Sequence, residues 1–347
     1  MAGVYLKDKS TGNEMVTLAH GAGGVQSSEL IHKLFIEKFS NSVIERMEDS
    51  AIVDLPNDGF HLAFTTDSFV VNPIFFKGGD IGKLAVCGTV NDLSCVGAVP
   101  RYLTMGFIIE EGFPISSLEK ISESIAATAA SCGVSIVAGD TKVVPSKAAD
   151  GIFINSAGIG IIKNNIAISC SNATPGDIII VSGGIGEHGA AILLARDDLG
   201  LQADIGSDCA PLNNMIHSVI SISKIHTIRD ITRGGLAAVL NEISGQSGVG
   251  MTILEDSIPL RKDVSAVCEI LGLDPLNMAC EGRVVLIVPP SSAIAVLGAL
   301  RNHADGSGAQ IIGEVTNGKQ GRVSMVTSSG GTRVIFMPSG EQLPRIC

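Results

Sequence analysis

Apolar residues recur along this chain with two periods, and the two kinds of segment alternate. Short runs of alternating or continuous apolar residues predict strands, and longer segments with apolar residues every three or four positions predict helices. The expected strands are 51–55, 61–66, 101–109, 134–138, 151–162, 177–182, 251–254, 284–288, 310–315 and 333–337. The expected helices are 27–39, 80–97, 116–133, 190–196, 211–223, one opened by 229–235, 264–271 and 294–302. Alternation in both halves predicts an α/β or α+β fold.

The order of these elements predicts two domains and a short tail. The first domain spans 1–165 and the second 176–337, and a mobile tail spans 338–347. Asp80 is a good N-cap for the helix that follows it, and Ser116-x-x-Glu119 has the form of a capping box. The segment 134–138 is expected to be a buried strand, and a turn is expected at 56–59, Pro-Asn-Asp-Gly.

Composition argues against several classes of protein. A chain of 347 residues is long enough for about two domains. Its eight cysteines form no C-x-x-C pair, which argues against a zinc site or a disulfide framework and favours a reducing compartment such as the cytoplasm. The net charge of −11 disfavours nucleic acid and anionic membranes as partners. Residues 1–10 lack the apolar core of a signal peptide, and Pro289-Pro290 interrupts the longest apolar stretch, 284–300.

Four aspartates form the strongest chemical signal. Asp49 precedes an expected strand, and Asp67 and Asp140 follow strands. Asp92 lies on the apolar face of the helix 80–97, where a carboxylate is costly unless it is paired or binds a metal. Strand ends in one sheet can converge, and a set of oxygen ligands favours Mg²⁺, which bridges to nucleotide phosphates. Each aspartate alone is more often a cap or turn residue, but together they predict a site for Mg²⁺ and ATP.

Three glycine-rich segments could supply backbone N–H groups to a phosphate. Segment 20–24 precedes the first helix, and 183–189 lies between an expected strand and helix. Segment 229–235 adds two arginines at a helix start, which suits a phosphate or a dimer contact. Each signal is weak alone, because a flexible linker or a surface salt-bridge turn explains it nearly as well.

The chain ends on a cysteine, Cys347, after Pro344-Arg345-Ile346. Pro344 stiffens the backbone, and the fixed charge of Arg345 is expected to favour the reactive thiolate. The segment 337–340, Met-Pro-Ser-Gly, predicts a hinge, and residues 338–347 would reach ~33–36 Å when extended. A thiol on such an arm indicates a group carrier, and a chance cysteine on a frayed terminus is the alternative.

These motifs resemble those of the HypE family of hydrogenase maturation factors over nearly the whole chain. The resemblance is carried by 78–93 (GGDIGKLAVCGTVNDL), 139–144 (GDTKVV), 229–235 (RDITRGG) and the terminal Pro-Arg-Ile-Cys. The wider superfamily of aminoimidazole ribonucleotide synthetase, selenophosphate synthetase and thiamine-monophosphate kinase shares the acid pattern but not that tail. Two positions depart from the family pattern: Ile231 replaces a proline, and Glu187 replaces an aspartate before His188.

The resemblance implies a two-domain, aminoimidazole ribonucleotide synthetase-like fold whose N-terminal sheets pair in a homodimer. It implies that a carbamoyltransferase, HypF, loads a carbamoyl group onto the Cys347 thiol. Dehydration with ATP would then give a thiocyanate, and the cyanide would pass to iron held by a HypC–HypD complex for a nickel–iron hydrogenase.

The motif positions of the family also assign roles to single residues. Cys347 would carry the group, Lys142 could stabilise charge on the transferring phosphoryl group, and Glu281 could act as a base or be a plain turn residue. The nucleotide would be bound by Asp67, Asn91, Asp92, Gly139, Asp140 and Thr141, and the metal by Asp49, Asp67, Asp92 and Asp140.

Two other classes of function are compatible with the same residues. Another ATP-dependent enzyme of the superfamily would phosphorylate a small-molecule amide or carbonyl oxygen. A selenophosphate synthetase would want Cys or selenocysteine in the loop 20–24, which has neither. A non-enzymatic scaffold would bind a metal or a partner thiol through Cys347, with no ATP turnover, and would leave the four aspartates unexplained.

Overall fold

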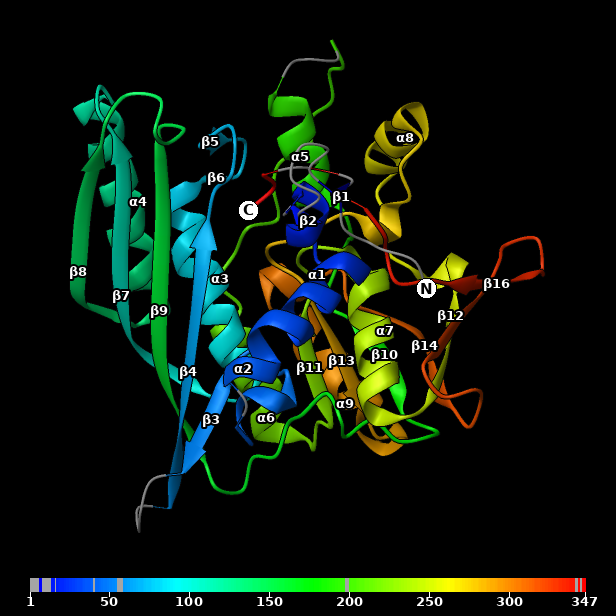
Figure 1. Ribbon diagram of the computed structural model, residues 1–347. Coiled ribbons are helices and arrows are strands. Elements are labelled where there is room, and N and C mark those ends of the chain that lie inside the picture. Colours follow the sequence, from blue (N-terminus) through cyan, green and yellow to red (C-terminus); the bar gives the residue numbers. More distant parts are fainter. Residues whose placement is uncertain are drawn as a thin grey trace.

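A computed structural model describes residues 6–7, 14–15, 17–39, 41–54, 59–196, 200–340, 343 and 345–347. The chain forms two sheets in two domains, with the five-stranded sheet on the left of Figure 1 and the seven-stranded sheet on the right. The expected turn residues 56–58 and the tail residues 341, 342 and 344 lie outside the described residues. No helix among the described residues is both long and apolar enough to cross a membrane.

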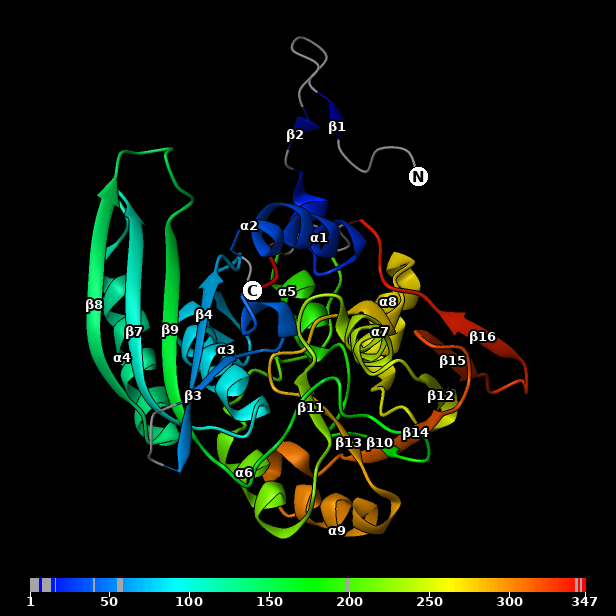
Figure 2. The ribbon, with the colours of Figure 1, turned by 60° about the horizontal axis from the view of Figure 1, so that its bottom comes forward.

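The first domain is a five-stranded sheet with helices on one face. Its strands follow the order β3 (Ala51–Asp54), β4 (Phe60–Phe69), β9 (Ile152–Lys163), β7 (Val99–Glu110) and β8 (Ser135–Val144), and only the β7–β8 pair is parallel. The helix α4 (Ile115–Cys132) connects β7 to β8 as a crossover, and α3 (Ile81–Cys95) packs beside it (Figure 2). A parallel pair needs such a crossover, whereas the antiparallel pairs do not.

The helix α3 is buried along almost its whole length because it lies between the two domains. It packs on β4 and β9 of the first sheet and contacts α6 and β11 of the second domain. Its start is fixed as the sequence predicts: the Asp80 side chain accepts hydrogen bonds from the backbone N–H groups of Gly82 (2.7 Å) and Lys83 (3.2 Å). A helix with two packed faces needs small and apolar residues around most of its circumference, and α3 has them at most positions.

Two expectations for the first domain are wrong. The strand at 134–138 is not a buried one: it belongs to β8, an edge strand that continues to Val144 and is exposed at every residue but that one. The face of the sheet opposite the helices is open as well, and it exposes Phe64, Tyr102 and Ile108. The capping box at Ser116 is not formed either, because α4 begins at Ile115 with Pro114 at the N-cap.

The second domain is a seven-stranded sheet covered on both faces. Its strands follow the order β11 (Thr227–Asp230), β13 (Val284–Val288), β10 (Ile178–Val181), β14 (Gln310–Thr316), β12 (Gly250–Leu254), β15 (Arg322–Val326) and β16 (Thr332–Ile335). Its helices are α5 (Glu187–Ala195), α6 (Asn213–Ile222), α7 (Gly235–Ser247), α8 (Lys262–Leu271) and α9 (Pro290–Arg301).

Two hydrophobic cores explain the continuous apolar runs of this sheet. In β13, Val284 and Leu286 face the core that contains α6 and α9, while Val285 and Ile287 face the core that contains α7. A strand buried on both faces needs apolar residues at consecutive positions, so the run 284–288 is fully buried. The strand β15 was not expected from the sequence.

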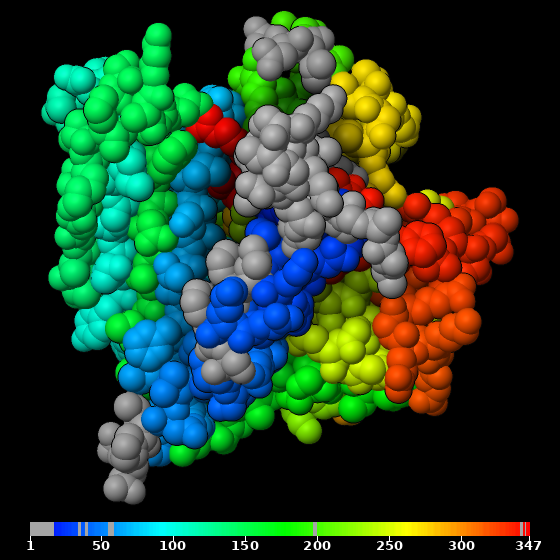
Figure 3. All heavy atoms as spheres, in the orientation of Figure 1, coloured from blue at the N-terminus to red at the C-terminus, as the bar shows by residue number. Residues whose placement is uncertain are grey.

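The N-terminal helices and the C-terminal tail connect the domains. The expected helix 27–39 begins earlier, with Gly24 at the N-cap, and consists of α1 (Val25–Leu30), a π-helical segment (Ile31–Ile36) and α2 (Glu37–Phe39). Small strand pairs are formed by β1 (Leu6–Lys7) with β2 (Glu14–Met15) and by β5 (Phe75–Phe76) with β6 (Gly79–Asp80). The red atoms of the tail return to the first domain (Figure 3).

Candidate active site

A cavity of about 190 Å³ brings acidic side chains of both domains together with the terminal cysteine. Its lining residues are Asp49, Thr65, Thr66, Asp67, Gly88, Asp92, Arg229, Asp230, Thr232, Arg233, Glu281 and Cys347. We call this cavity the acidic pocket. Three of the four aspartates singled out in the sequence therefore share one cavity with both Glu281 and Cys347.

Regular elements place the first-domain side chains in the acidic pocket. Thr65 and Asp67 alternate with Phe64 and Thr66 on β4, so they point to the helix-covered face of the sheet. Asp92 comes from α3, and its Oδ2 accepts a hydrogen bond from the Thr65 hydroxyl at 2.7 Å. Gly88 lies one turn earlier on α3. A side chain at this position would clash with Phe69, because its Cβ would lie 2.9 Å from the Phe69 ring.

The second domain contributes four charged groups, two from the end of β11 and two from loops beside its strands. Asp230 ends β11, Arg233 follows in the loop before α7, and Glu281 lies before β13. Arg229 pairs with Asp49 of the first domain at 2.7 Å and with Glu242 of its own domain at 2.9 Å, so the first of these ion pairs joins the two domains. The segment 229–235 is therefore a contact between domains as well as a wall of the acidic pocket.

The carboxyl groups of the acidic pocket are electrostatically strained. Burial raises the pKa of Asp230 to about 6, against the opposing charge of Arg229. Burial also raises the pKa of Asp67, and it raises the pKa of Asp92 well above its usual range with help from the charges of Asp230 and Asp49. Because buried carboxylates that repel one another are costly, this arrangement favours a bound cation.

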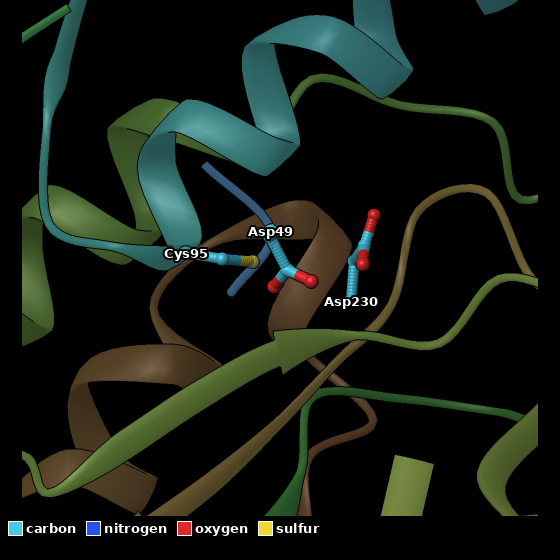
Figure 4. A group of neighbouring side chains, drawn as sticks. All are labelled: Asp49, Cys95 and Asp230. Atoms are coloured by element: carbon cyan, nitrogen blue, oxygen red, sulfur yellow. The ribbon is translucent and has the colours of Figure 1, made fainter. Parts of the chain in front are cut away.

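The residues present fit a hard divalent cation. Asp49 Oδ2 is buried and has no hydrogen-bond partner among the described residues. Asp49, Cys95 and Asp230 each offer one atom, and these atoms lie within 4.8 Å of one another (Figure 4). Burial raises the pKa of Cys95 well above its usual value, so its thiol stays protonated and is a poor ligand. The carboxylate oxygens are the donors that Mg²⁺ prefers.

Glu281 is a buried acid with an unused oxygen. Its side chain is 4% exposed, and its Oε1 has no hydrogen-bond partner among the described residues. Its backbone N–H donates to Asp208 Oδ1 at 3.0 Å, which fixes the loop. Burial raises the pKa of Glu281 well above the usual value, and nearby Cys209 and Asp230 add to the rise. A carboxylate with a raised pKa binds a proton more tightly, and this property suits a general base that takes a proton from the substrate.

Cys347 is docked inside the protein, with 9% of its surface exposed. Burial raises the pKa of its thiol to about 12, and the charge of Arg233 opposes that rise only in part. The expectation that Arg345 favours the thiolate is wrong. The Arg345 guanidinium pairs with Asp150, and its Nε donates to the Val70 carbonyl at 2.8 Å. Its charge is therefore already paired with another carboxylate.

The remaining predicted site residues lie outside the acidic pocket. Asn91 is buried, and its amide is bonded to the backbone of the second domain: Nδ2 donates to Ala210 O at 3.1 Å, and Oδ1 accepts from Leu212 N at 2.8 Å. Gly139, Asp140, Thr141 and Lys142 lie on the exposed edge strand β8. Lys142 and Asp140 pair at 2.7 Å there. A single chain does not bring them to Cys347.

Two glycine-rich loops meet near the acidic pocket. A Cβ on Gly23 would lie 2.7 Å from Arg233 O, and one on Gly234 would lie 2.7 Å from Gly23 O, and both glycines have positive φ. The third loop, 183–189, is largely buried, and Glu187 at the start of α5 pairs with Arg283 at 3.0 Å. A carboxylate paired at that helix start leaves little place for a phosphate.

Two larger cavities adjoin the acidic pocket through shared lining residues. A cavity of about 350 Å³ shares Arg233 and Cys347 with it and is lined by other residues of the tail. A cavity of about 830 Å³ shares Arg229, Asp230, Thr232 and Arg233 and extends along α1 and α7. The space around the acids therefore exceeds what a metal ion alone would fill.

Sequence reasoning missed Asp230 and Thr65 as site residues. Asp230 carries the same signal as the predicted aspartates, because it ends an apolar strand. Arg233 was not missed in this way, because the sequence already indicated the arginines of segment 229–235 for a phosphate or a dimer contact. Thr65 has no signal of its own, since hydroxyls are common in strands.

Two family models cover most of the chain. The N-terminal domain of AIR synthase related proteins matches residues 47–162, and the C-terminal domain of the same family matches residues 174–326. A carbamoyl dehydratase HypE of Rhizobium leguminosarum bv. viciae is 46% identical over 349 aligned residues, which cover all of this chain and 99% of the relative. The chain belongs to the HypE family.

Solved HypE structures agree with this assignment. A HypE in complex with ATP has a TM-score of 0.80 and 46% identity, over 96% of this chain and all of that one. A HypE–HypF complex gives a TM-score of 0.84 and 47% identity, over 89% of this chain and 99% of the matched one. The two-domain fold expected for a HypE is therefore confirmed.

Proposed function

We propose that this chain is an ATP-dependent carbamoyl dehydratase that acts on its own Cys347 during hydrogenase maturation. The observation that carries the proposal is the position of Cys347, which lines the acidic pocket together with Asp67, Asp92 and Glu281. The names of its relatives, carbamoyl dehydratase HypE, support the reaction class. Docking of the tail supports the choice of thiol, because the chain brings its own cysteine to the acids.

The reaction follows from the chemistry of an S-carbamoyl group. Its carbonyl oxygen attacks the γ-phosphorus of ATP, ADP leaves, and one N–H proton passes to a base, which gives an S-linked iminophosphate. The second N–H proton is then removed as the C–O bond breaks, phosphate leaves and the C≡N bond forms. Carbamoyl thioester and ATP thus become thiocyanate, ADP and phosphate.

Glu281 is the base that we assign to these proton transfers. It lies in the same pocket as Cys347, it is buried, and its Oε1 has no other partner among the described residues. A raised pKa suits a base, because the group holds the proton that it removes from nitrogen. Arg233, the cation that most affects the Cys347 thiol, would stabilise charge on the transferring phosphoryl group.

Asp49, Asp67, Asp92 and Asp230 would hold Mg²⁺. A bound Mg²⁺ would neutralise phosphate charge and orient the γ-phosphate. The cavity of about 830 Å³ that shares Asp230 and Thr232 with the acidic pocket has room for the rest of the nucleotide. The complex of a HypE with ATP supports this choice of nucleotide.

A homodimer would explain the open face of the first sheet. That face exposes Phe64, Tyr102 and Ile108, and the same sheet carries Asp140 and Lys142 on its edge strand. Large apolar side chains gathered on one uncovered sheet are typical of an interface. We infer that pairing of two such faces covers them, and that Asp140 and Lys142 then act at the pocket of the second subunit.

External partners would supply and accept the group on Cys347. The HypE–HypF complex supports HypF as the carbamoyl donor, and a HypC–HypD complex would accept the cyanide at iron. Because Cys347 is buried in the docked tail, it must leave the acidic pocket to reach either partner. Residues 338–347 would reach ~33–36 Å when extended, which allows such an exchange. We infer a reducing compartment, the cytoplasm, because the eight cysteines of the chain form no C-x-x-C pair.

The test is phosphate release in a single turnover. The chain is first loaded with carbamoyl phosphate and HypF, freed of HypF, and then given ATP and Mg²⁺. We expect about one phosphate per loaded chain, none from Cys347→Ala, and the wild-type amount from Cys268→Ala, which removes a buried thiol of α8. Phosphate release that persists in Cys347→Ala would refute the proposal and would favour a small-molecule substrate.

A further inference from the structure

The docked tail is recognised through its backbone carbonyl groups. The Val70 N–H donates to Cys347 O at 3.0 Å, and the Asn72 N–H donates to Arg345 O at 3.2 Å. The Arg196 guanidinium donates to Arg345 O at 3.0 Å, and His188 Nε2 lies 2.7 Å from Ile346 O. All three terminal carbonyls are therefore engaged by the rest of the chain.

His188 is the contact whose chemistry is most tightly determined. It is fully buried in the first turn of α5, and the edge of the Phe76 ring packs against it with centroids 5.5 Å apart. Its Nδ1 lies 2.7 Å from Ser207 Oγ, which accepts a hydrogen bond from the Cys209 N–H at 3.0 Å. The buried imidazole is thus held at both nitrogens.

These partners fix the tautomer of His188. A carbonyl oxygen can only accept, so Nε2 must carry the hydrogen that is donated to Ile346 O. Burial lowers the pKa of His188 to about 4, which keeps the ring neutral at physiological pH. Nδ1 is then the acceptor, and the Ser207 hydroxyl donates to it. The hydrogen bonds therefore run in one direction: the Ser207 hydroxyl donates to His188, and His188 donates to the Ile346 carbonyl of the tail.

We propose that His188, oriented by Ser207, is a positioning residue that latches the C-terminal tail in the acidic pocket by binding the main-chain carbonyl of Ile346. The latch makes no hydrogen bond to the Cys347 side chain. It can therefore hold the tail whether the sulfur is free, carbamoylated or converted to thiocyanate. Only this last point rests on the proposed function, because the latch itself concerns the unmodified chain.

The conformation of the tail is consistent with a latch. Arg345 has φ of +52°, a left-handed backbone conformation that a residue with a Cβ adopts at a cost. The docked state must offset this cost through its contacts, so the loss of one of them shifts the balance toward an undocked tail. A hydrogen bond of this kind corresponds to about a tenfold change in an equilibrium.

The experiment measures the reaction of Cys347 with N-ethylmaleimide in the full chain, without ATP or partners. Peptide mass spectrometry follows each cysteine separately. We expect His188→Ala to raise the rate at Cys347 about tenfold, with the seven other cysteines unchanged, and His188→Gln to restore a slow rate because its amide N–H can reach the same carbonyl. The control is His303→Gln, which removes a partly buried histidine that also contacts a serine, Ser218 at 3.0 Å.

A wild-type rate at Cys347 in His188→Ala, with the thermal midpoint of unfolding unchanged, would overturn the latch. If His188→Ala fails to fold, Ser207→Ala serves instead, because it removes the hydroxyl that orients the ring and leaves the imidazole in place. A wild-type rate at Cys347 in that variant would also count against the latch. The two proposals fail separately. A latch that is confirmed by labelling stands even if Cys347 releases no phosphate in the turnover experiment.

Discussion

Replacing Asp230 by asparagine should stabilise the metal-free protein at neutral pH. Burial raises the pKa of Asp230 from its usual 3.8 to about 6, so at neutral pH the folded chain holds an unfavourable charge. At about 1.4 kcal/mol per pH unit, the cost is about 3 kcal/mol. Asparagine has nearly the same shape and carries no charge, so the cost disappears.

The stability advantage of Asp230→Asn should depend on pH. Below pH 3.8 the carboxyl is protonated in both the folded and the unfolded chain, and Asp230→Asn should match the wild type. As pH rises toward about 6, the unfolded chain ionises while the folded chain resists, so the stability that the bound proton provides is lost. The advantage of the variant should therefore grow between about pH 4 and 6 and stay constant above that range.

Thermal unfolding in EDTA at pH 4 and pH 8 measures the effect. If both domains unfold in one transition, 3 kcal/mol corresponds to about 4 °C in Tm for a chain of this length. Asp140→Asn is the control, because this exposed carboxylate has its pKa lowered by Lys142 and should gain nothing. Mg²⁺ with ATP should reverse the order, since the wild type keeps the better ligand set. Equal Tm values at pH 8, or the same gain at both pH values, would refute the reasoning.

Three further predictions follow from the site and its supports. Glu281→Gln should lower ATP-dependent dehydration about 10²–10⁴-fold while carbamoyl loading is unchanged, and an unaltered single-turnover rate would remove Glu281 as the base. Gly282→Ala should lower the free energy of unfolding by about 1–3 kcal/mol, because its Cβ would lie 1.8 Å from a backbone oxygen. Gly298→Ala has open space around it and should not destabilise the protein, so equal midpoints of thermal unfolding for the two variants would contradict this reasoning. Chains with Lys142→Ala and chains with Cys347→Ala should regain activity when mixed, if Lys142 serves the second subunit, and a mixture as inactive as either variant would exclude that arrangement.

The sequence predicts those features that depend on local patterns. The run 284–288 forms a strand, and Asp80 caps a helix, because periodicity and capping are set by neighbouring residues. Asp67 and Asp92 meet in one cavity as predicted, although β4 continues past Asp67 to Phe69, because both side chains lie between the first sheet and the helix α3 that covers it. Asp230 ends an apolar strand, and the rule for acids at strand ends, applied to every strand, would have found it.

Other features depend on contacts that are distant in sequence. The strand expected at 134–138 was predicted to end at residue 138, yet β8 continues to Val144 because β7 offers a partner along its whole length. That pairing places Asp140 and Lys142 on an open edge rather than at the strand end. The docking of the tail is also beyond the sequence pattern, since many of its hydrogen bonds are made by backbone carbonyls, which every residue carries.

The most direct test of the account is the intact mass of the chain after loading. The protein is incubated with carbamoyl phosphate, ATP, Mg²⁺ and HypF, beside Cys347→Ala, and the terminal peptide is sequenced by mass spectrometry. The account predicts a gain of one carbamoyl group on Cys347, followed by an ATP-dependent loss of one water, and neither change in the variant. A carbamoyl adduct that forms on Cys347 but keeps its water in the presence of Mg²⁺ and ATP would contradict it.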